Sequence, residues 1–218
     1  MSGASGLWRA ALKLGRGGRR RKGLPPLLLF TDPDRTPDPV RIAARLPRGA
    51  GVVFRPFDRP EALAQGPALR RLCARRRLVF LVGADARLAA RLRADGVHFP
   101  QRLAGRRGEI RRLPRRWIVT AAAHDIPAVL RERRCGFAAL VISPVFASAS
   151  PSAGRPIGPQ HLAAMVRAAR LSVYALGGIK AGNVARLGLA GVAGVAAVDA
   201  LACPGKSGPA RRTGGSRT

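Results

Sequence analysis

Two adjacent glycines, Gly177 and Gly178, stand where an apolar stretch, SVYAL (172–176), gives way to the helix-like stretch IKAGNVARLGLA. Bare backbone at such a junction lets a ligand approach closely, and the first N–H groups of a following helix carry partial positive charge. Both features suit a phosphate group. A tight turn without a ligand explains the same glycines, because glycine pairs often mark turns. This stretch alone leaves both interpretations open.

Charged and polar side chains also follow other apolar runs. Arg55 ends GVVFR, at a position where a charged side chain has little structural use, which favours a function. His98 lies within GVHF, and both a site role and a capping role stay open for it. His124 precedes Asp125 in a pattern that fits a helix start, so a structural role is favoured there. Ser148 and Ser150 lie in an Ala/Ser/Pro loop that fits either a lid or a plain flexible loop.

Eight short apolar runs, separated by amphipathic Ala/Leu/Arg-rich spacers, must position these side chains. The runs are residues 27–31, 51–55, 78–82, 96–99, 117–120, 138–143, 172–176 and 194–198. Alternating strands and helices with strands apolar throughout predict a parallel sheet covered by helices, and eight units close into a (β/α)₈ barrel. A doubly wound open sheet is the alternative, but it lacks a GxGxxG motif after a strand. Barrels commonly bind phosphate after strands seven and eight, which favours the phosphate interpretation of the glycine pair.

Length and charge set limits on the remaining possibilities. The chain has 218 residues, 47% of them hydrophobic, and a formal net charge of +29. We expect one barrel domain over residues 25–203, with basic, disordered tails over 1–24 and 204–218. The remaining arginines are scattered along helix-like stretches and no RNA-binding signature is present, so no specific nucleic-acid partner is expected. No apolar run is long enough for a transmembrane segment and no secretory signal is evident, which predicts a cytoplasmic protein.

The order of the motifs resembles thiamine-phosphate synthase and its TenI-like relatives. The motifs are FTDPD, GVVFR, ADGVHFPQ, VTAAAHD, VISPVFASAS, YALGGIKAGNV and GVAAVDAL, and the resemblance covers residues 27–203. The resemblance implies a small (β/α)₈ barrel. In the synthase it also implies Mg²⁺-dependent coupling of a hydroxymethylpyrimidine pyrophosphate with a thiazole phosphate, with release of pyrophosphate through a carbocation-like pyrimidine intermediate.

The resemblance also implies roles for individual residues. Arg55 and Ser148 are the candidate catalytic residues, and Asp85 is the candidate ligand for Mg²⁺ if the protein is active. The candidate substrate-binding residues are Arg55, His98, Gln101, His124, Ser148, Ser150, Arg155, Gly177 and Gly178. Of these, Arg55 and Arg155 would stabilise the departing pyrophosphate, and the glycine pair would hold the thiazole phosphate.

Six positions depart from the family pattern, two of them in the strand-two motif, where Val53 and Phe57 replace a glutamine and a lysine. Ala84 and Leu103 stand where the family carries metal-binding aspartates, and Pro151 stands where it carries a lysine that contacts pyrophosphate. Asp199 replaces a serine after strand eight, and a carboxylate there repels a phosphate. The acid–base histidine expected of a TenI-like enzyme within residues 143–146 is absent.

These observations support three hypotheses. The first is a divergent thiamine-phosphate synthase that acts on small phosphorylated pyrimidine and thiazole metabolites. The second is a catalytically degenerate barrel that binds such metabolites or regulates their pathway. The third, an RNA-associated protein, depends on the basic tails.

Overall fold

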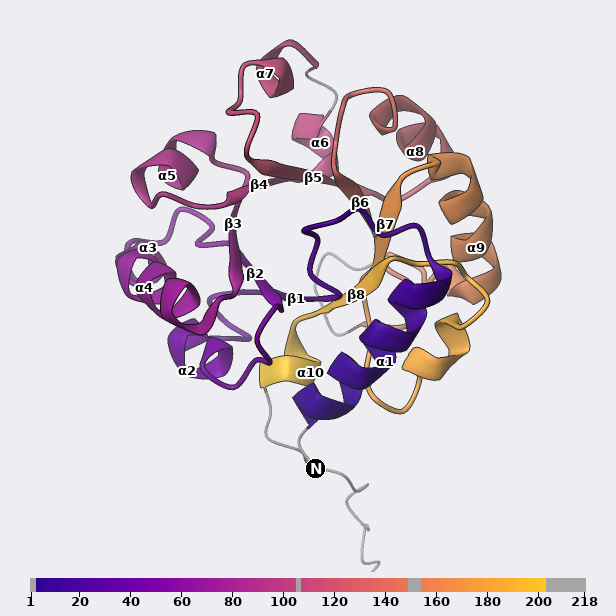
Figure 1. The fold of residues 1–218 in the computed structure, drawn as a ribbon, viewed down its shortest axis with the longest axis horizontal. Helices are drawn as coiled ribbons and strands as arrows, with labels where there is room; N and C mark the ends of the chain where they lie inside the picture. The colour runs from indigo at the N-terminus through magenta and orange to yellow at the C-terminus, as the bar shows by residue number, and fades with distance from the viewer. Residues whose placement is uncertain (1–2, 105–106, 149–153, 203–218) are drawn as a thin grey trace, which may run out of the picture.

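The computed structural model describes residues 3–104, 107–148 and 154–202, and its centre is a closed barrel of parallel strands (Figure 1). Each strand pairs in parallel with the next, and β8 pairs with β1 to close the ring. The strands are β1 (Leu27–Phe30), β2 (Gly51–Phe54), β3 (Val79–Gly83), β4 (Gly96–Phe99), β5 (Ile118–Ala123), β6 (Ala139–Ile142), β7 (Ser172–Ala175) and β8 (Gly194–Ala197). The predicted barrel is therefore confirmed, and each strand overlaps a predicted run, with β3 and β5 extending beyond their runs to Gly83 and Ala123.

The strands are apolar throughout because both of their faces are buried. Leu28 and Phe30 of β1 belong to a cluster inside the barrel that includes Tyr174. Leu27 and Leu29 belong instead to the larger cluster between the sheet and the helices. Alternate residues of a strand point to opposite faces, so a strand with helices outside and packed side chains inside has no solvent face.

Helices cover the outside of the barrel, as Figure 1 shows. Three of them begin at an aspartate whose carboxylate accepts a backbone N–H of the first turn, namely Asp38, Asp85 and Asp125. The helices after β1 are α2 (Pro39–Ala43), α3 (Pro60–Ala64), α4 (Gly66–Arg76), α5 (Ala86–Arg91), α6 (Gln101–Ala104), α7 (Arg107–Arg111), α8 (Ile126–Glu132), α9 (Gly158–Ala169), the 3₁₀ helix η1 (Val184–Leu187) and α10 (Asp199–Ala202).

The expectation of a disordered tail over residues 1–24 is wrong for the described part of that segment. Residues Gly3–Gly17 form helix α1, which lies beside β8 and α10 (Figure 1) and buries Leu7 and Ala11 completely. The chain then stays attached to the barrel, since the Arg21 N–H donates to the Ser172 hydroxyl at 3.0 Å. The physical reason is that α10 spans only four residues, so α1 supplies apolar cover for β8.

The predicted C-terminal tail, residues 204–218, lies outside the described residues. Among the described helices, none has the length and apolar character needed to cross a bilayer.

Candidate active site at the mouth of the barrel

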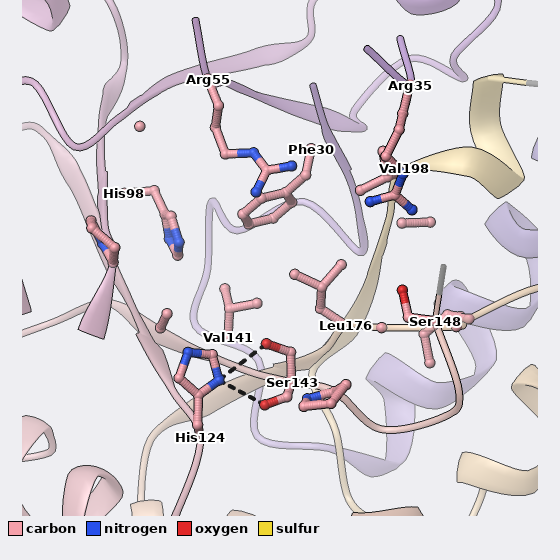
Figure 2. A pocket seen from close by; sticks show the side chains of 18 of the residues that line it. Phe30, Arg35, Arg55, His98, His124, Val141, Ser143, Ser148, Leu176 and Val198 are labelled. Carbon is pink, nitrogen blue, oxygen red and sulfur yellow. Dashed lines mark hydrogen bonds between the residues drawn. The ribbon is translucent and has the colours of Figure 1, made fainter. Parts of the chain in front are cut away.

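A cavity of about 1070 Å³ opens at the carboxyl ends of the strands, and segments following all eight strands line it. Figure 2 shows Arg55, His98 and His124 directed into the same space, with the Phe30 ring next to the Arg55 guanidinium. Among the described residues, five cationic side chains line this cavity, namely Arg35, Arg55, Arg102, Arg155 and Lys180. Its three carboxylates are Asp58, Asp85 and Asp199. Such a surplus of positive charge suits an anionic ligand.

Arg55 is held by the loop that follows β1. Its backbone N–H donates to the Thr31 hydroxyl and its Nε–H donates to the Thr31 carbonyl, both at 2.8 Å. Its guanidinium carbon lies 5.2 Å from the ring centre of Phe30 and 5.1 Å from that of Phe57. Burial lowers the pKa of Arg55 to about 10, and Asp32 opposes this shift, so the group stays charged at neutral pH. The result is a desolvated, oriented cation at the mouth.

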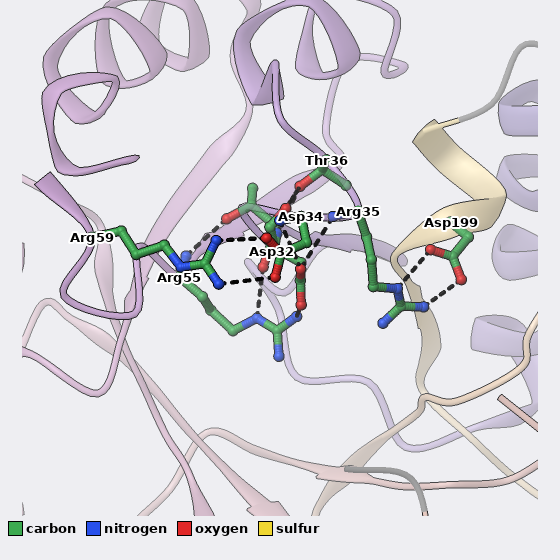
Figure 3. Close-up of polar contacts among 8 residues, drawn as sticks. Asp32, Asp34, Arg35, Thr36, Arg55, Arg59 and Asp199 are labelled. Carbon is green, nitrogen blue, oxygen red and sulfur yellow. Dashed lines mark hydrogen bonds and ion pairs between the residues drawn. The ribbon is translucent and has the colours of Figure 1, made fainter. Parts of the chain in front are cut away.

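The loop after β1 is organised by hydrogen bonds to Asp32 (Figure 3). The Asp32 carboxylate accepts the backbone N–H groups of Asp34 and Arg35 at 3.2 Å each, and the Asp32 N–H donates to the Thr36 hydroxyl at 2.7 Å. Asp34 pairs with Arg59 through two contacts. These two aspartates therefore build the turn that supports Arg55.

Arg35 joins the first loop to the last one. Its guanidinium forms a two-pronged ion pair with Asp199, in which Nε donates to Oδ1 at 2.8 Å and the terminal nitrogen donates to Oδ2. The carboxylate expected to repel a phosphate is thus neutralised by a partner that the sequence interpretation missed. The sequence signal for Arg35 was its position in the loop that follows β1.

His98 lies at the edge of the barrel interior and lines the cavity floor. Its Nδ1 shares a hydrogen bond of 3.0 Å with the Thr120 hydroxyl, and its ring meets Phe30 edge to face at 5.0 Å. Burial lowers the pKa of His98 to about 3, with Arg55 and His124 adding to the shift. The imidazole is therefore neutral at physiological pH and can offer a hydrogen bond but no charge.

His124 follows β5 and is fixed by two neighbouring loops. Its Nδ1–H donates to the Ser143 carbonyl at 2.7 Å, and its backbone N–H donates to the Gln101 side-chain oxygen at 2.7 Å. Because Nδ1 carries the proton in this arrangement, Nε2 is the acceptor nitrogen of the neutral ring. Asp125 alone caps the next helix. His124 instead lines the cavity (Figure 2), where the sequence favoured a structural role.

The glycine pair after β7 is required by its own loop. Gly177 and Gly178 have φ angles of 95° and 63°, and a Cβ atom on Gly178 would lie 2.2 Å from the Ala147 carbonyl oxygen. Asn183 holds the turn, because its amide donates to the Gly178 carbonyl at 2.8 Å and its oxygen accepts the Lys180 N–H at 2.9 Å. Within the described residues, no hydrogen bond engages the N–H of Gly178. The turn therefore needs glycine for packing and still presents a donor.

The structure also places the remaining candidates. Ser148 and Arg155 line the cavity, whereas Ser150 and Pro151 lie outside the described residues. Arg102 and Lys180, which the sequence interpretation did not select, line it as well. Each stands directly beside a selected motif, next to Gln101 and after GGI respectively, and that adjacency was the available signal.

The described residues do not form a set that fits Mg²⁺. Asp85 accepts the Leu88 N–H at 2.8 Å and so caps α5, and Asp199 is paired with Arg35. Within the described ranges no group of three or more His, Cys, Asp or Glu side chains is placed to hold a metal ion. Mg²⁺ needs oxygen ligands in near-octahedral geometry, commonly one or two carboxylates beside substrate phosphates. Of the three carboxylates among the described lining residues, Asp85 and Asp199 are held by structural contacts, which leaves Asp58.

Fold and cavity together define a (β/α)₈-barrel protein with a basic, strand-end mouth. The chain belongs to the thiamine monophosphate synthase family, whose profile matches residues 30–201.

Individual relatives agree with this assignment. The chain is 33% identical to the thiamine biosynthesis bifunctional protein ThiED of Geobacter sulfurreducens, over 80% of this chain but 36% of the relative. It is 30% identical to the thiamine-phosphate synthase of Alcanivorax borkumensis, over 80% of this chain and 84% of that protein. Among solved structures, the thiamine phosphate pyrophosphorylase from Pyrococcus furiosus superposes with a TM-score of 0.68 and 25% identity, covering 81% and 86% of the two chains.

Proposed function

We propose that this protein is a divergent thiamine-phosphate synthase that joins a hydroxymethylpyrimidine pyrophosphate to a thiazole phosphate and releases pyrophosphate. The observation that carries the proposal is Arg55, a desolvated cation held over the cavity by Thr31, Phe30 and Phe57. Among the described residues, the acidic partner of Arg55 is Asp32, whose carboxylate lies 3.8 Å from a terminal guanidinium nitrogen. The Arg55 guanidinium suits a leaving group that gains negative charge.

The reaction needs one bond broken and one formed. The C–O bond between the pyrimidine methylene and the pyrophosphate breaks, and its electron pair leaves with the pyrophosphate. The thiazole nitrogen then donates its lone pair to the methylene carbon, which forms the C–N bond of a thiazolium product. Arg55 and Arg155 stabilise the departing pyrophosphate, and no proton transfer is required at the reacting atoms. The protein therefore contributes orientation and charge.

Other residues of the mouth position the two substrates. The Gly178 N–H and Lys180 bind the thiazole phosphate after β7, and Ser148 contacts the pyrophosphate from the loop after β6. His98, Gln101 and the Nε2 atom of His124 lie on the side of the mouth formed by β4 and β5, where they contact the pyrimidine ring. No step is assigned to Mg²⁺.

Two features favour a second function, in which the barrel binds the metabolites without catalysis. The ion pair between Arg35 and Asp199 lies on the β8 side of the mouth, where phosphate binds in many barrels, and the family's metal aspartates are replaced by Ala84 and Leu103. A barrel that binds the phosphorylated metabolites without turning them over fits these features. A cytoplasmic location stays a prediction under either function.

A coupling assay separates the two functions. Purified protein is incubated with both precursors, and thiamine phosphate is detected after oxidation to its fluorescent thiochrome form. The synthase proposal predicts product from the natural protein, little product from Arg55→Ala, and natural levels from Arg167→Ala, which removes an exposed arginine on the outer helix α9. Folded protein that binds both precursors and forms no product would instead support the binding function.

A further inference from the structure

The carboxylates of the mouth are largely engaged in structural roles. Asp85 begins α5 by accepting the Leu88 N–H, and Asp199 is bound to both prongs of the Arg35 guanidinium. The third lining carboxylate, Asp58, sits at a left-handed backbone position, φ 58°, on an exposed turn after β2. A divalent cation would therefore find few unengaged carboxylate oxygens in this cavity.

Arg55, in contrast, keeps part of its guanidinium available to a ligand. The Nε–H of Arg55 donates to the Thr31 carbonyl, and the terminal nitrogens of its guanidinium point into the cavity (Figure 2). Its contacts with the Phe30 and Phe57 rings fix the plane of the group, and its ion pair with Asp32 is long, at 3.8 Å. A guanidinium fixed in this way presents parallel N–H donors that match phosphate oxygens.

Arg102 adds a second positive group near the end of β4. It lines the cavity and is exposed, and it is the immediate neighbour of Leu103, where the family pattern would have a metal-binding aspartate. A guanidinium at this position repels a divalent cation and attracts the phosphate that the cation would otherwise hold. Among the described residues, five cations and three carboxylates line the cavity, and Asp32 beside Arg55 adds a fourth carboxylate, so positive charge remains in excess.

We infer that the mouth binds a diphosphate group through guanidinium groups, chiefly those of Arg55 and Arg102, in a mode that needs no divalent cation. The inference rests on the proposed function, because it assigns the site of the leaving group of that reaction. It differs from the function in what it requires: a diphosphate binds here in the presence of a chelator, whether or not coupling follows.

The test is calorimetric titration of the full chain with inorganic pyrophosphate, once with EDTA and once with Mg²⁺, at an ionic strength of about 0.15 M to screen the general positive charge. Three variants accompany the natural protein. Arg55→Gln and Arg102→Gln each remove one proposed ligand, and Arg102 is exposed, so its replacement does not threaten folding. Arg167→Gln removes an equal charge from the outer surface and serves as the matched control.

We expect binding in EDTA that is within about threefold of binding in Mg²⁺, and a loss of about tenfold or more in each of the two mouth variants but not in the control. Binding that disappears in EDTA and returns with Mg²⁺ would overturn the inference and leave the synthase proposal standing. Equal losses in the mouth variants and the control would also overturn it, since general charge would then explain the attraction. Pyrophosphate binding in EDTA without any coupling would sink the synthase proposal alone.

Discussion

The two sides of the barrel mouth are built on different principles. On the side of β1 and β2, charged side chains hold one another, with Asp32 organising the loop, Asp34 paired with Arg59, and Arg55 anchored to Thr31 (Figure 3). On the side of β6 and β7, the backbone itself forms the surface, because Gly177 and Gly178 lie against the Pro144–Ala147 segment without side chains between them.

The difference indicates how each side binds charge. The first side presents a side-chain cation that has lost much of its hydration, so its strength depends on one residue type. The second side presents backbone N–H donors, so its strength depends on loop geometry. Substitutions should therefore act on binding at the first side, and on both binding and stability at the second.

The largest effect is expected for Arg55. Replacing it with glutamine should lower kcat/KM for coupling by about a hundredfold, because one oriented donor to the developing negative charge is lost. Arg55→Lys should recover only part of this loss, since an ammonium keeps the charge but not the planar fork. The coupling assay measures both. Full activity in the lysine variant would contradict the assigned geometry.

Gly178 tests the second side of the mouth. Gly178→Ala places a side chain at φ 63° and 2.2 Å from the Ala147 carbonyl oxygen, so the free energy of unfolding should fall by about 1–3 kcal/mol. Affinity for the thiazole phosphate should fall as well. Gly182→Ala is the matched control, because no atom lies within 4 Å of the added methyl group. Urea unfolding curves of the two variants compare them, and equal stabilities would refute the packing argument.

His98, on the cavity floor, should make the free energy of unfolding depend on pH. The pKa of His98 in the folded protein is about 3, below the ordinary value of 6.5. Between these two pH values, His98 is protonated in the unfolded chain and neutral in the folded protein. Stability should therefore fall as pH drops from about 6.5 toward 3, by up to about 1.4 kcal/mol per pH unit. His98→Gln should flatten this slope by as much as one proton. An unchanged slope would show that His98 is protonated in the folded protein.

The smallest effect is expected at the ion pair between Arg35, after β1, and Asp199, after β8. Asp199→Ser removes the partner of Arg35 and restores the residue type of the family pattern. The freed guanidinium should strengthen thiazole phosphate binding by about threefold to tenfold, a change measurable by calorimetry. Arg35→Gln should have the opposite effect, because it leaves Asp199 unpaired beside the phosphate. Weaker binding in Asp199→Ser would mean that the ion pair itself shapes the site.

Much of the fold was predictable, because strands buried on both faces read as apolar runs. Each predicted run overlaps a strand, and Asp125 was predictable as a helix start. The N-terminal helix was not. Its Arg-rich composition resembles a tail, and its burial of Leu7 depends on the short α10 at the other end of the chain.

The site was predictable where position along the chain determines position in space. Arg55, His98 and the glycine pair follow from the rule that strand ends meet at the mouth. The ion pair between Arg35 and Asp199 joins residues 164 positions apart, and no local pattern specifies such a contact. Likewise, the choice of Asp85 as a metal ligand did not take into account that its carboxylate caps α5.

The most direct test of the account is single-turnover coupling of the two precursors by the natural protein in EDTA, beside the same reaction in Mg²⁺ and with Arg55→Gln. If arginines hold the leaving group, thiamine phosphate should form in both solutions and be nearly absent in the variant. Product that forms only with Mg²⁺, or at an equal rate in the variant, would contradict that claim.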